Sequence, residues 1–455
     1  MPMRSTNPMN GEVLREYPEL TDAELEAKLA RAEKAFYAWR ETSFEERAIL
    51  MRKLAGYLRT QSHALSTLMA LEMGKTLKAG VAELEKCALT CEFYADQTAT
   101  ILGHESTTLG VTESYVQFDP LGTVLAVMPW NFPFWQVYRF AIPALMAGNV
   151  GVLKHASNVP QCAEAIEESF RACGFPEDVF QNLLIGSARV EAVVRDARIK
   201  AVTLTGSEYA GSMVAKAAGE ELKKTVLELG GSDPFIVLED ADIDAAAAAA
   251  VTARLQGNVG QSCIAAKRFI VHASVAEAFT EKFAQGFARL RLGNPLEEGV
   301  DVGPLASKQM REEIDAQVQN SLSKGARLVC GGKRVDEVSN LYEPTILTDV
   351  KKGMPVYDEE VFGPVAAIIT VSDEEEAIRI ANDTPYGLGA SLFTKDLARA
   401  KRLVTKIEAG AVFVNSPVKS DPRTPFGGIK KSGYGRELSH YGIKEFVNIK
   451  TVSIK

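Results

Sequence analysis

The chain has 455 residues, which is too long for one simple core and fits two or three domains. With 46% hydrophobic and 24% charged residues, its composition is globular and excludes an intrinsically disordered protein. The 51 basic and 59 acidic residues give a net charge of −8, which argues against partners such as nucleic acids or membrane surfaces.

The number and spacing of the cysteines and the first residues of the chain indicate the cellular compartment of the protein. The six cysteines are sparse and form no Cys-x-x-Cys pair, so neither a disulfide framework nor a metal site is expected. The first twelve residues are polar, and no run reaches the roughly 18 apolar residues of a membrane span. These features predict a cytoplasmic enzyme without a membrane segment.

The first hundred residues are predicted to be helical. Thr21–Glu24 and Ser43–Glu46 are capping boxes, in which side chains satisfy the free amides at a helix start. Behind the first box, apolar residues recur at helical spacing and predict one buried stripe: Leu25, Leu29, Ala32, Phe36 and Trp39.

From about residue 112 the pattern changes to strands. Ser114–Phe118 alternates like a strand, and residues 119–122 form a predicted turn. Strands then alternate with helix-length segments, which predicts a parallel sheet covered on both faces, an architecture that commonly binds nucleotides. The apolar runs are Thr123–Met128, Val150–Leu153, Gln181–Ile185 and Ala201–Thr205.

A second alternating region extends from about residue 234 to 425 and includes an alanine-rich helix near Asp244–Leu255. The final segment, Glu445–Lys455, alternates like a strand. We favour pairing of this strand with another subunit, and the alternative is that it covers its own domain.

The central chemical feature is the lone Cys263 after the small-residue turn Gly260-Gln261-Ser262. Upstream, Glu228 stands between apolar and glycine residues. This combination suits a thiolate nucleophile and a base that activates water. None of the five histidines is close to Cys263 in sequence, so a cysteine–histidine pair is not indicated.

Two strand ends carry polar side chains. Asn131, inside the motif Pro-Trp-Asn-Phe-Pro, could donate a hydrogen bond to a developing oxyanion, although two prolines could equally make a rigid turn. At the next strand end, Lys154 and Ser157 stand where an acidic residue would bind a ribose 2′-hydroxyl, and they can accept a phosphate instead. The alternative is an ordinary surface lysine.

Three glycine-containing segments remain open from the residues alone. The segment Thr205–Gly211 could bring amides to a pyrophosphate at a helix start, but it is weaker than a full Gly-x-Gly-x-x-Gly motif and could be a plain turn. Residues 359–364 could place a carboxylate on a ribose and an aromatic ring near a nicotinamide. The glycine-dense segment 425–437 has no assigned purpose.

Taken together, the motifs resemble the aldehyde dehydrogenase superfamily over nearly the whole chain. In order they are PWNFP, KxAS, TGSxxxG, LELGG, GQSC, EEVFGP and PFGGxKxSGxGRE. The closing run 435–442 is most similar to bacterial succinate-semialdehyde dehydrogenases. The resemblance implies an α/β fold with a Rossmann-type cofactor domain (1–112 and 122–229), an α/β catalytic domain (230–435) and a small oligomerisation β-ribbon (113–121 and 440–455).

The resemblance also implies roles for single residues. Cys263 matches the nucleophile that forms a thiohemiacetal and then a thioester. Asn131 and the Cys263 amide match the oxyanion hole, and Glu228 matches the base that activates water. The positions that match cofactor contacts are Trp130, Lys154, Ser157, Gly186, Gly206, Ser207, Gly211, Leu229, Glu360 and Phe362.

For the substrate, the resemblance implies succinate semialdehyde, with other small or ω-carboxy aldehydes as alternatives. Arg139 matches the arginine that pairs with the substrate carboxylate, and Ser420 could add a hydrogen bond. Gly257 departs from the pattern, because a second arginine would be expected there. Ala265 replaces a partner cysteine, so a disulfide switch with Cys263 is impossible.

We expect NADP as the preferred cofactor, NAD as a possible one, no metal, and a homodimer or homotetramer. Three other functions are weighed. In a coenzyme A-acylating dehydrogenase there would be less need for Glu228. A non-redox cysteine hydrolase would act on amides or thioesters, and a non-catalytic structural relative would not need the intact nucleophile, base and amide.

Overall fold

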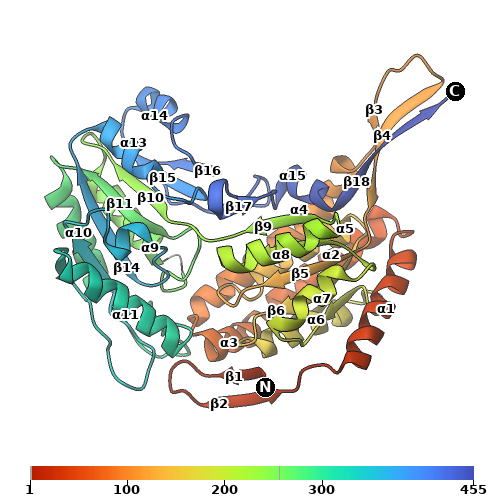
Figure 1. The fold of residues 1–455 in the computed structure, drawn as a ribbon, viewed down its shortest axis with the longest axis horizontal. Coiled ribbons are helices and arrows are strands. Elements are labelled where there is room, and N and C mark those ends of the chain that lie inside the picture. Colours follow the sequence, from red (N-terminus) through yellow and green to blue (C-terminus); the bar gives the residue numbers. More distant parts are fainter. Residues whose placement is uncertain (1–2, 256) are drawn as a thin grey trace.

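The computed structural model describes residues 3–255 and 257–455. Figure 1 shows two lobes side by side, each built on its own sheet, and a narrow β-ribbon that projects from one end and carries the C-terminus. Each lobe has its own cluster of buried apolar side chains. Glu228 ends β9 (Lys224–Glu228), just before the chain passes to the second lobe, and Cys263 precedes β11 (Ala266–His272) of the second lobe and packs against the core of the first.

The chain starts with a short hairpin rather than a helix, so the prediction of helix for the first hundred residues is wrong for about the first twenty. Strands β1 (Met3–Thr6) and β2 (Val13–Tyr17) pair antiparallel. In a hairpin with so few buried side chains, the alternating pattern is too weak to be seen in the sequence. The helices that follow are α1 (Asp22–Trp39), α2 (Phe44–Thr60), α3 (Ser62–Met73) and α4 (Leu77–Ile101).

Both predicted capping boxes are confirmed. The Thr21 and Ser43 hydroxyls accept hydrogen bonds from the amides of Glu24 and Glu46, and the two glutamates reach back to the cap amides. The predicted apolar stripe of α1 is the buried face of that helix. Sequence therefore fixes these helix starts and the face that each helix turns to the core.

The first lobe contains, within the described residues, a six-stranded sheet. Five of its strands are parallel, and β17 joins at the edge in the antiparallel direction. The spatial order is β17 (Gly433–Tyr434), β9 (Lys224–Glu228), β8 (Ile199–Thr205), β5 (Thr123–Met128), β6 (Val150–His155) and β7 (Phe180–Asn182). The accompanying helices are α5 (Trp135–Met146), α6 (Pro160–Ala172), η1 (Ser187–Arg189), α7 (Val190–Arg195) and α8 (Glu208–Glu220).

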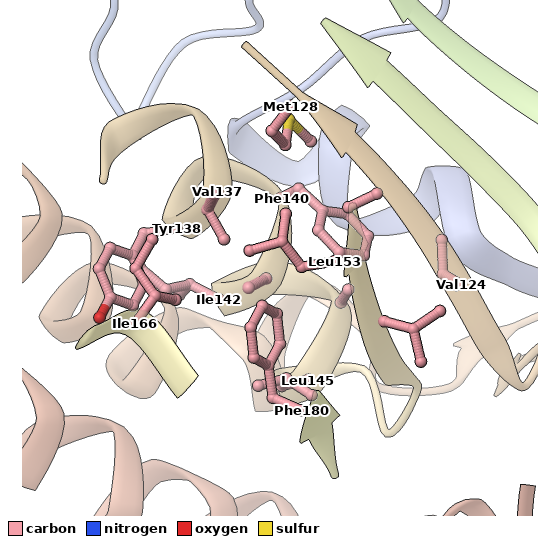
Figure 2. Packing of buried hydrophobic residues seen from close by; sticks show 14 of the residues in the cluster. Val124, Met128, Val137, Tyr138, Phe140, Ile142, Leu145, Leu153, Ile166 and Phe180 are labelled. Carbon is pink, nitrogen blue, oxygen red and sulfur yellow. The ribbon is translucent and has the colours of Figure 1, made fainter. Parts of the chain in front are cut away.

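Helix α5 is buried along its whole length, because it lies between the N-terminal helices and the sheet. Figure 2 shows Phe140 of this helix near Leu153 of β6, with Ile142 on the side of Ile166 of α6. Burying each of these large apolar side chains stabilises the fold by about 1.5–3 kcal/mol. The packing fixes α5, and with it the loop that carries Asn131.

The second lobe contains, in the part of the chain that is described, a seven-stranded sheet. Only β12 runs antiparallel to its neighbour. The order is β12 (Arg327–Cys330), β13 (Thr345–Thr348), β14 (Val365–Val371), β11 (Ala266–His272), β10 (Asp233–Val237), β15 (Gly389–Phe393) and β16 (Ala411–Val414). Its helices are α9 (Ile243–Leu255), α10 (Ala276–Ala288), α11 (Lys308–Ser323), α12 (Pro355–Asp358), α13 (Glu374–Asn382) and α14 (Leu397–Val404).

The C-terminal segment forms the ribbon seen at the upper right of Figure 1. After η2 (Lys430–Ser432), α15 (Ser439–Ile443) and η3 (Lys444–Phe446), strand β18 (Val447–Ile454) pairs antiparallel with β4 (Glu113–Pro120). Strand β3 (Glu105–Ser106) pairs with the other edge of β4. Among the described strands, β18 has a neighbour on one edge only. No helix within residues 3–255 and 257–455 has the length and apolar character needed to cross a bilayer.

Candidate active site

Cys263 lies in the loop that enters strand β11, and this loop is sharply curved. Gly260 has φ +75°, and a Cβ on it would collide with the Gly363 carbonyl oxygen, so glycine is required here. Beyond the loop, the buried Lys267 donates from Nζ to the carbonyl oxygens of Ser262 at 2.8 Å and of Cys263 at 2.7 Å. The tight turn and the lysine together hold the thiol in place.

Arg254, near the end of α9, ties the nucleophile loop to the segment Val361–Gly363. Its buried guanidinium donates to the carbonyl oxygens of Gly260 at 2.9 Å, Ala266 at 2.7 Å, Val361 at 3.0 Å and Gly363 at 2.5 Å. Burial lowers the pKa of Arg254 to about 9, so the side chain remains charged at neutral pH. One cation therefore fixes two loops that are far apart in sequence.

A cavity of about 200 Å³ opens onto the half-buried Cys263. Burial raises the pKa of Cys263 to about 12, while the charges of Arg139 and Lys267 act in the opposite direction. None of the five histidines is among the residues that line the cavity. The lining residues are Ala79, Ala82, Glu83, Lys86, Phe132, Trp135, Gln136, Arg139, Gly257, Ser262, Cys263, Ile264, Lys419, Ser420 and Phe426.

Asn131 follows strand β5 and reaches the nucleophile loop. Its Nδ2 donates to the Gln261 carbonyl oxygen at 3.0 Å. Its own carbonyl oxygen accepts from Lys75 Nζ at 3.0 Å and from Asn258 Nδ2 at 2.6 Å. Because an amide nitrogen carries two hydrogens, Nδ2 keeps a second donor beside the loop. This placement fits the predicted role of Asn131 in an oxyanion hole.

His155 fixes the same loop and does not act on the thiol. Its Nδ1 accepts from the Ala156 amide at 2.9 Å and lies 3.3 Å from the Met128 carbonyl oxygen, and its Nε2 lies 3.0 Å from the Pro133 carbonyl oxygen. Burial lowers the pKa of His155 to about 4, which keeps the ring neutral. The histidine therefore positions the Asn131 loop through its backbone.

Glu228 ends strand β9 and is 1% exposed. Neither carboxyl oxygen has a hydrogen-bond partner among the described residues. Burial raises the pKa of Glu228 well above its ordinary value, and Glu437 raises it further, whereas Arg139 and Arg436 act in the opposite direction. The Glu228 charge also raises the pKa of Cys263, so the two groups are within electrostatic range. A buried carboxyl group with unpaired oxygens and a raised pKa suits a general base.

The glycine-dense segment, which the sequence left undecided, packs against the strand of the base. Gly433 pairs with Glu228 in the two-strand ladder of β17 and β9, and a Cβ on it would collide with the Leu227 carbonyl oxygen. A Cβ on Gly427 would lie 2.8 Å from Glu228 Oε1. The glycines therefore let the C-terminal loop cover Glu228 closely.

The phosphate-binding candidates meet at the end of β6. Lys154 is 9% exposed, and Ser157 lies exposed three residues later. Burial lowers the pKa of Lys154, and the charge of Glu19 acts in the opposite direction. Glu19 Oε2 accepts from the Gly186 amide at 3.0 Å. The structure thus brings Lys154 and Gly186 to one place and adds a carboxylate from the N-terminal segment that sequence reasoning missed.

Helix α8 begins beside the end of β9, as a pyrophosphate-binding helix should. Ser207 caps it by accepting from the Ala210 amide at 3.3 Å, and the Gly206 amide donates to the Glu228 carbonyl oxygen at 3.0 Å. A Cβ on Gly211 would lie 2.6 Å from Leu229 Cδ2, so glycine lets the helix approach that side chain. These residues lie together at the start of α8, and their contact with a dinucleotide stays a prediction.

The aromatic and acidic candidates from the EEVFGP motif also come together. The rings of Trp130 and Phe362 meet edge to face with centroids 5.9 Å apart. Glu360 Oε1 accepts from the Gly231 amide at 3.0 Å and lies 3.3 Å from Lys267 Nζ. Glu360 is therefore held between the LELGG motif and the lysine that supports the nucleophile loop.

Arg139 lines the cavity, but its guanidinium is already engaged. It forms an ion pair with Glu437, and Nη2 donates to Thr205 Oγ1 at 3.2 Å. The guanidinium carbon lies 4.6 Å from the centroid of the Phe426 ring. Its predicted pairing with a substrate carboxylate stays a prediction.

Sequence reasoning missed Arg254, Lys267 and Lys86. A signal existed for the first two, since Arg254 is a single cation in an alanine-rich helix and Lys267 stands at the start of an apolar strand. Both could have been read as buried cations that need oxygen partners. Lys86 gave no such signal, because only the packing of α4 brings it to the cavity.

Comparison with known proteins agrees with this geometry. The model of the aldehyde dehydrogenase family matches residues 1–452. The chain is 53% identical over 454 residues to a protein of Synechocystis sp. named probable succinate-semialdehyde dehydrogenase, NADP(+), with all of both chains covered. It is 50% identical over 457 residues to the Mycobacterium tuberculosis protein named succinate-semialdehyde dehydrogenase, NADP(+), 1, again over both full lengths.

The same similarity holds in three dimensions. The crystal structure of a succinic semialdehyde dehydrogenase from Streptococcus pyogenes, in complex with NADP+, superimposes with a TM-score of 0.97 at 39% identity, covering 99% of each chain. The predicted α/β fold class and the resemblance inferred from the seven motifs are confirmed. The chain belongs to the aldehyde dehydrogenase family.

Proposed function

We propose that this chain oxidises succinate semialdehyde to succinate with NADP as the hydride acceptor. The observation that carries the proposal is one cavity that joins the Cys263 thiol to cationic side chains, with the unpaired carboxyl group of Glu228 within electrostatic range. The names of the Synechocystis and Mycobacterium relatives support both the substrate and the cofactor.

In the proposed reaction, Cys263 first loses its proton to water, which the charges of Arg139 and Lys267 favour. The sulfur then bonds to the aldehyde carbon, and the resulting oxyanion accepts hydrogen bonds from Asn131 Nδ2 and the Cys263 amide. Loss of a hydride from the former aldehyde carbon, for which a bound dinucleotide would supply the acceptor, leaves a thioester on Cys263. Glu228 takes a proton from a water molecule whose oxygen bonds to the thioester carbon. The carbon–sulfur bond then breaks, releasing the acid and the thiolate.

For the cofactor, the preference for NADP rests on Lys154 and Ser157 at the strand end. A lysine and a hydroxyl accept a 2′-phosphate, and the nearby Glu19 carboxylate, which would repel it, accepts a hydrogen bond from the Gly186 amide. NAD, which lacks this phosphate, remains a possible second cofactor. In a Ser157→Glu variant we expect kcat/KM with NADP to fall far more than kcat/KM with NAD. Equal losses with the two dinucleotides would show that Ser157 does not select between them.

Other functions are less consistent with the site. A cysteine hydrolase would normally use histidine, and no histidine lines the cavity among the described residues. A coenzyme A-acylating dehydrogenase would have less use for a base such as Glu228 within electrostatic range of the thiol. A different ω-carboxy or small aldehyde remains the main competitor, and a non-catalytic structural relative would have no need for the intact nucleophile, base and amide.

The proposal is tested by steady-state rates for a panel of carboxylated and neutral aldehydes with each dinucleotide. We expect succinate semialdehyde with NADP to give the highest kcat/KM, and free acid to form without added coenzyme A. Quenching during turnover and mass spectrometry should find an acyl adduct on Cys263, and Cys263→Ala should reduce no dinucleotide. An enzyme that turns over without such an adduct would refute the mechanism.

We further propose that the ribbon serves assembly into a homodimer or homotetramer in the cytoplasm. The free edge of β18 supports this, since an unpaired strand edge can add a strand from another copy. The division of the chain into a cofactor domain, a catalytic domain and the ribbon remains a prediction. Light scattering on the full chain, compared with a truncation before residue 447, would measure the oligomeric state.

A further inference from the structure

One wall of the cavity at Cys263 is a single face of helix α4. Ala79, Ala82, Glu83 and Lys86 recur at helical spacing and all line the cavity. The two alanines leave room, and the two charged residues define the electrostatics of this wall. Whether each charge already has a protein partner decides what the cavity can bind.

The negative charge on this wall belongs to Glu83, whose carboxylate is bound by other groups of the protein. Glu83 forms a buried ion pair with Lys75. Its Oε1 also accepts from the amides of Phe134 at 3.0 Å and of Trp135 at 2.8 Å, where α5 begins. Glu83 is therefore a structural carboxylate that anchors α4 to α5. Its charge favours the charged form of Lys86, but its ion pair is with Lys75.

The positive charge of Arg139 is likewise compensated. Its partner is Glu437, and both side chains are almost completely buried, at 2% and 5% exposure. From this position Arg139 favours the ionised forms of Cys263 and Glu228, because its charge acts to lower the pKa of each. A substrate carboxylate at Arg139 would compete with Glu437 for the same guanidinium.

Lys86 differs from both groups. No carboxylate lies within 4 Å of its Nζ in the part of the chain that the structure describes. Nζ donates to Ser420 Oγ at 2.5 Å and lies 4.0 Å from the centroid of the Trp135 ring. Both partners are neutral. Burial, with Arg139 nearby, lowers the pKa of Lys86 to about 8, while Cys87, Glu83 and Asp421 act in the opposite direction without forming an ion pair with it.

The cavity wall is open at Gly257. Gly257, where the family pattern led us to expect a second arginine, has φ +63° and lines the cavity. A Cβ on it would have one neighbour within 4 Å, the Cβ of Ala79 at 3.7 Å. Gly257 therefore supplies space and no charge. Lys419, the third cation that lines the cavity, is exposed, so solvent and salt screen its charge.

We propose that Lys86 is the cation that binds the carboxylate of the substrate, with Ser420 as its hydrogen-bonding partner. Lys86 thereby replaces the arginine missing at Gly257. The inference rests on the proposed function and deepens it, because it names the residue that selects carboxylated over neutral aldehydes. Pairing with a substrate carboxylate provides the anion that Lys86 lacks in the free protein.

The test compares Lys86→Met and Lys86→Arg with the wild-type enzyme, using succinate semialdehyde and the neutral pentanal as substrates and NADP as cofactor. We expect Lys86→Met to lower kcat/KM for succinate semialdehyde by about 10–100-fold, the usual effect of losing a hydrogen bond to a charged group, mostly through KM. The rate with pentanal should change by less than about twofold, since pentanal has no carboxylate to bind. Lys86→Arg should recover part of the loss.

A matched control is Lys78→Met, which removes the same charge from an exposed position on the same helix. This variant should behave like wild type with both aldehydes. An assay without turnover is alkylation of Cys263 by iodoacetamide. Succinate should slow this alkylation in the wild type and in Lys78→Met, and it should have no effect in Lys86→Met.

Two results would overturn the inference. Equal losses with both aldehydes in Lys86→Met would indicate a structural role in holding Trp135, and a selective loss in Arg139→Gln or Lys419→Met but not in Lys86→Met would assign the carboxylate elsewhere. Failure of the proposed function is a separate outcome. It would appear already in the wild type, as no preference for succinate semialdehyde over pentanal.

Discussion

The nucleophile loop and the base strand differ in how the protein holds them. Around Cys263, buried cations donate to a series of carbonyl oxygens, with Arg254 binding four of them and Lys267 two. At the end of β9, by contrast, neither oxygen of the Glu228 carboxyl group has a partner within the described chain. Glycine backbones cover this group instead.

This difference indicates that the protein controls the position of the nucleophile and the reactivity of the base in separate ways. A nucleophile must meet one carbon in one geometry, so its loop is fixed through backbone hydrogen bonds that leave the thiol itself unused. A base must accept and release a proton, so its oxygens stay unpaired and burial keeps its pKa high. Four predictions test this division, from the largest expected effect to the smallest.

Removing the base should give the largest effect. In Glu228→Gln we expect steady-state turnover to fall by about 10²–10⁴-fold, because an amide cannot take the proton of the attacking water. The first turnover should survive as a burst of reduced dinucleotide, measured by rapid mixing at 340 nm. The exposed Glu277→Gln serves as the control. A variant that keeps full turnover would remove Glu228 from the mechanism.

Removing the Arg254 guanidinium should mainly lower the free energy of unfolding. Arg254→Met leaves buried carbonyl oxygens without donors, and we expect the free energy of unfolding to fall by about 3–5 kcal/mol. Thermal and urea unfolding followed by circular dichroism would measure the loss, with the exposed Arg289→Met as control. If the two variants unfold alike, the four hydrogen bonds of Arg254 do not hold the loops.

A smaller change should disturb the base through its glycine cover. Gly427 has φ +152°, and a Cβ there would lie 2.8 Å from Glu228 Oε1. We expect Gly427→Ala to lose about 1–3 kcal/mol of stability and to slow release of the acid more than the burst. Gly219→Ala, in α8 with nothing within 4 Å of the new Cβ, should be neutral or slightly stabilising.

The mildest test changes only pH. Because burial raises the pKa of Glu228, its carboxyl group keeps its proton to higher pH than a free glutamate does, and only the deprotonated form acts as a base. Hydrolysis of the thioester should therefore accelerate as pH rises, by at most about tenfold per unit. Single-turnover release of acid would follow this rate. A profile that is flat, or unchanged in Glu228→Gln, would contradict the assignment.

Much of the fold around the site could be predicted from local sequence. The capping boxes at Thr21 and Ser43, the buried stripe of α1 and the strand that ends before Asn131 depend on neighbours within a few residues, and all are present in the structure. The N-terminal hairpin was missed because few of its side chains are buried. The terminal strand β18 was predicted from its alternating pattern. Its pairing with β4 could not be, because the two strands are more than 300 residues apart in the chain.

The sequence by itself determined the order of the motifs, and with it the family, because spaced glycines and single reactive side chains are local features. Only the tertiary structure decided how charges are matched. It gave Arg139 to Glu437, joined Arg254 to two loops and left Lys86 beside the neutral Ser420. The physical reason is that an ion pair or a buried hydrogen bond depends on distances of a few ångströms, and these are set by packing between segments that the linear sequence keeps far apart.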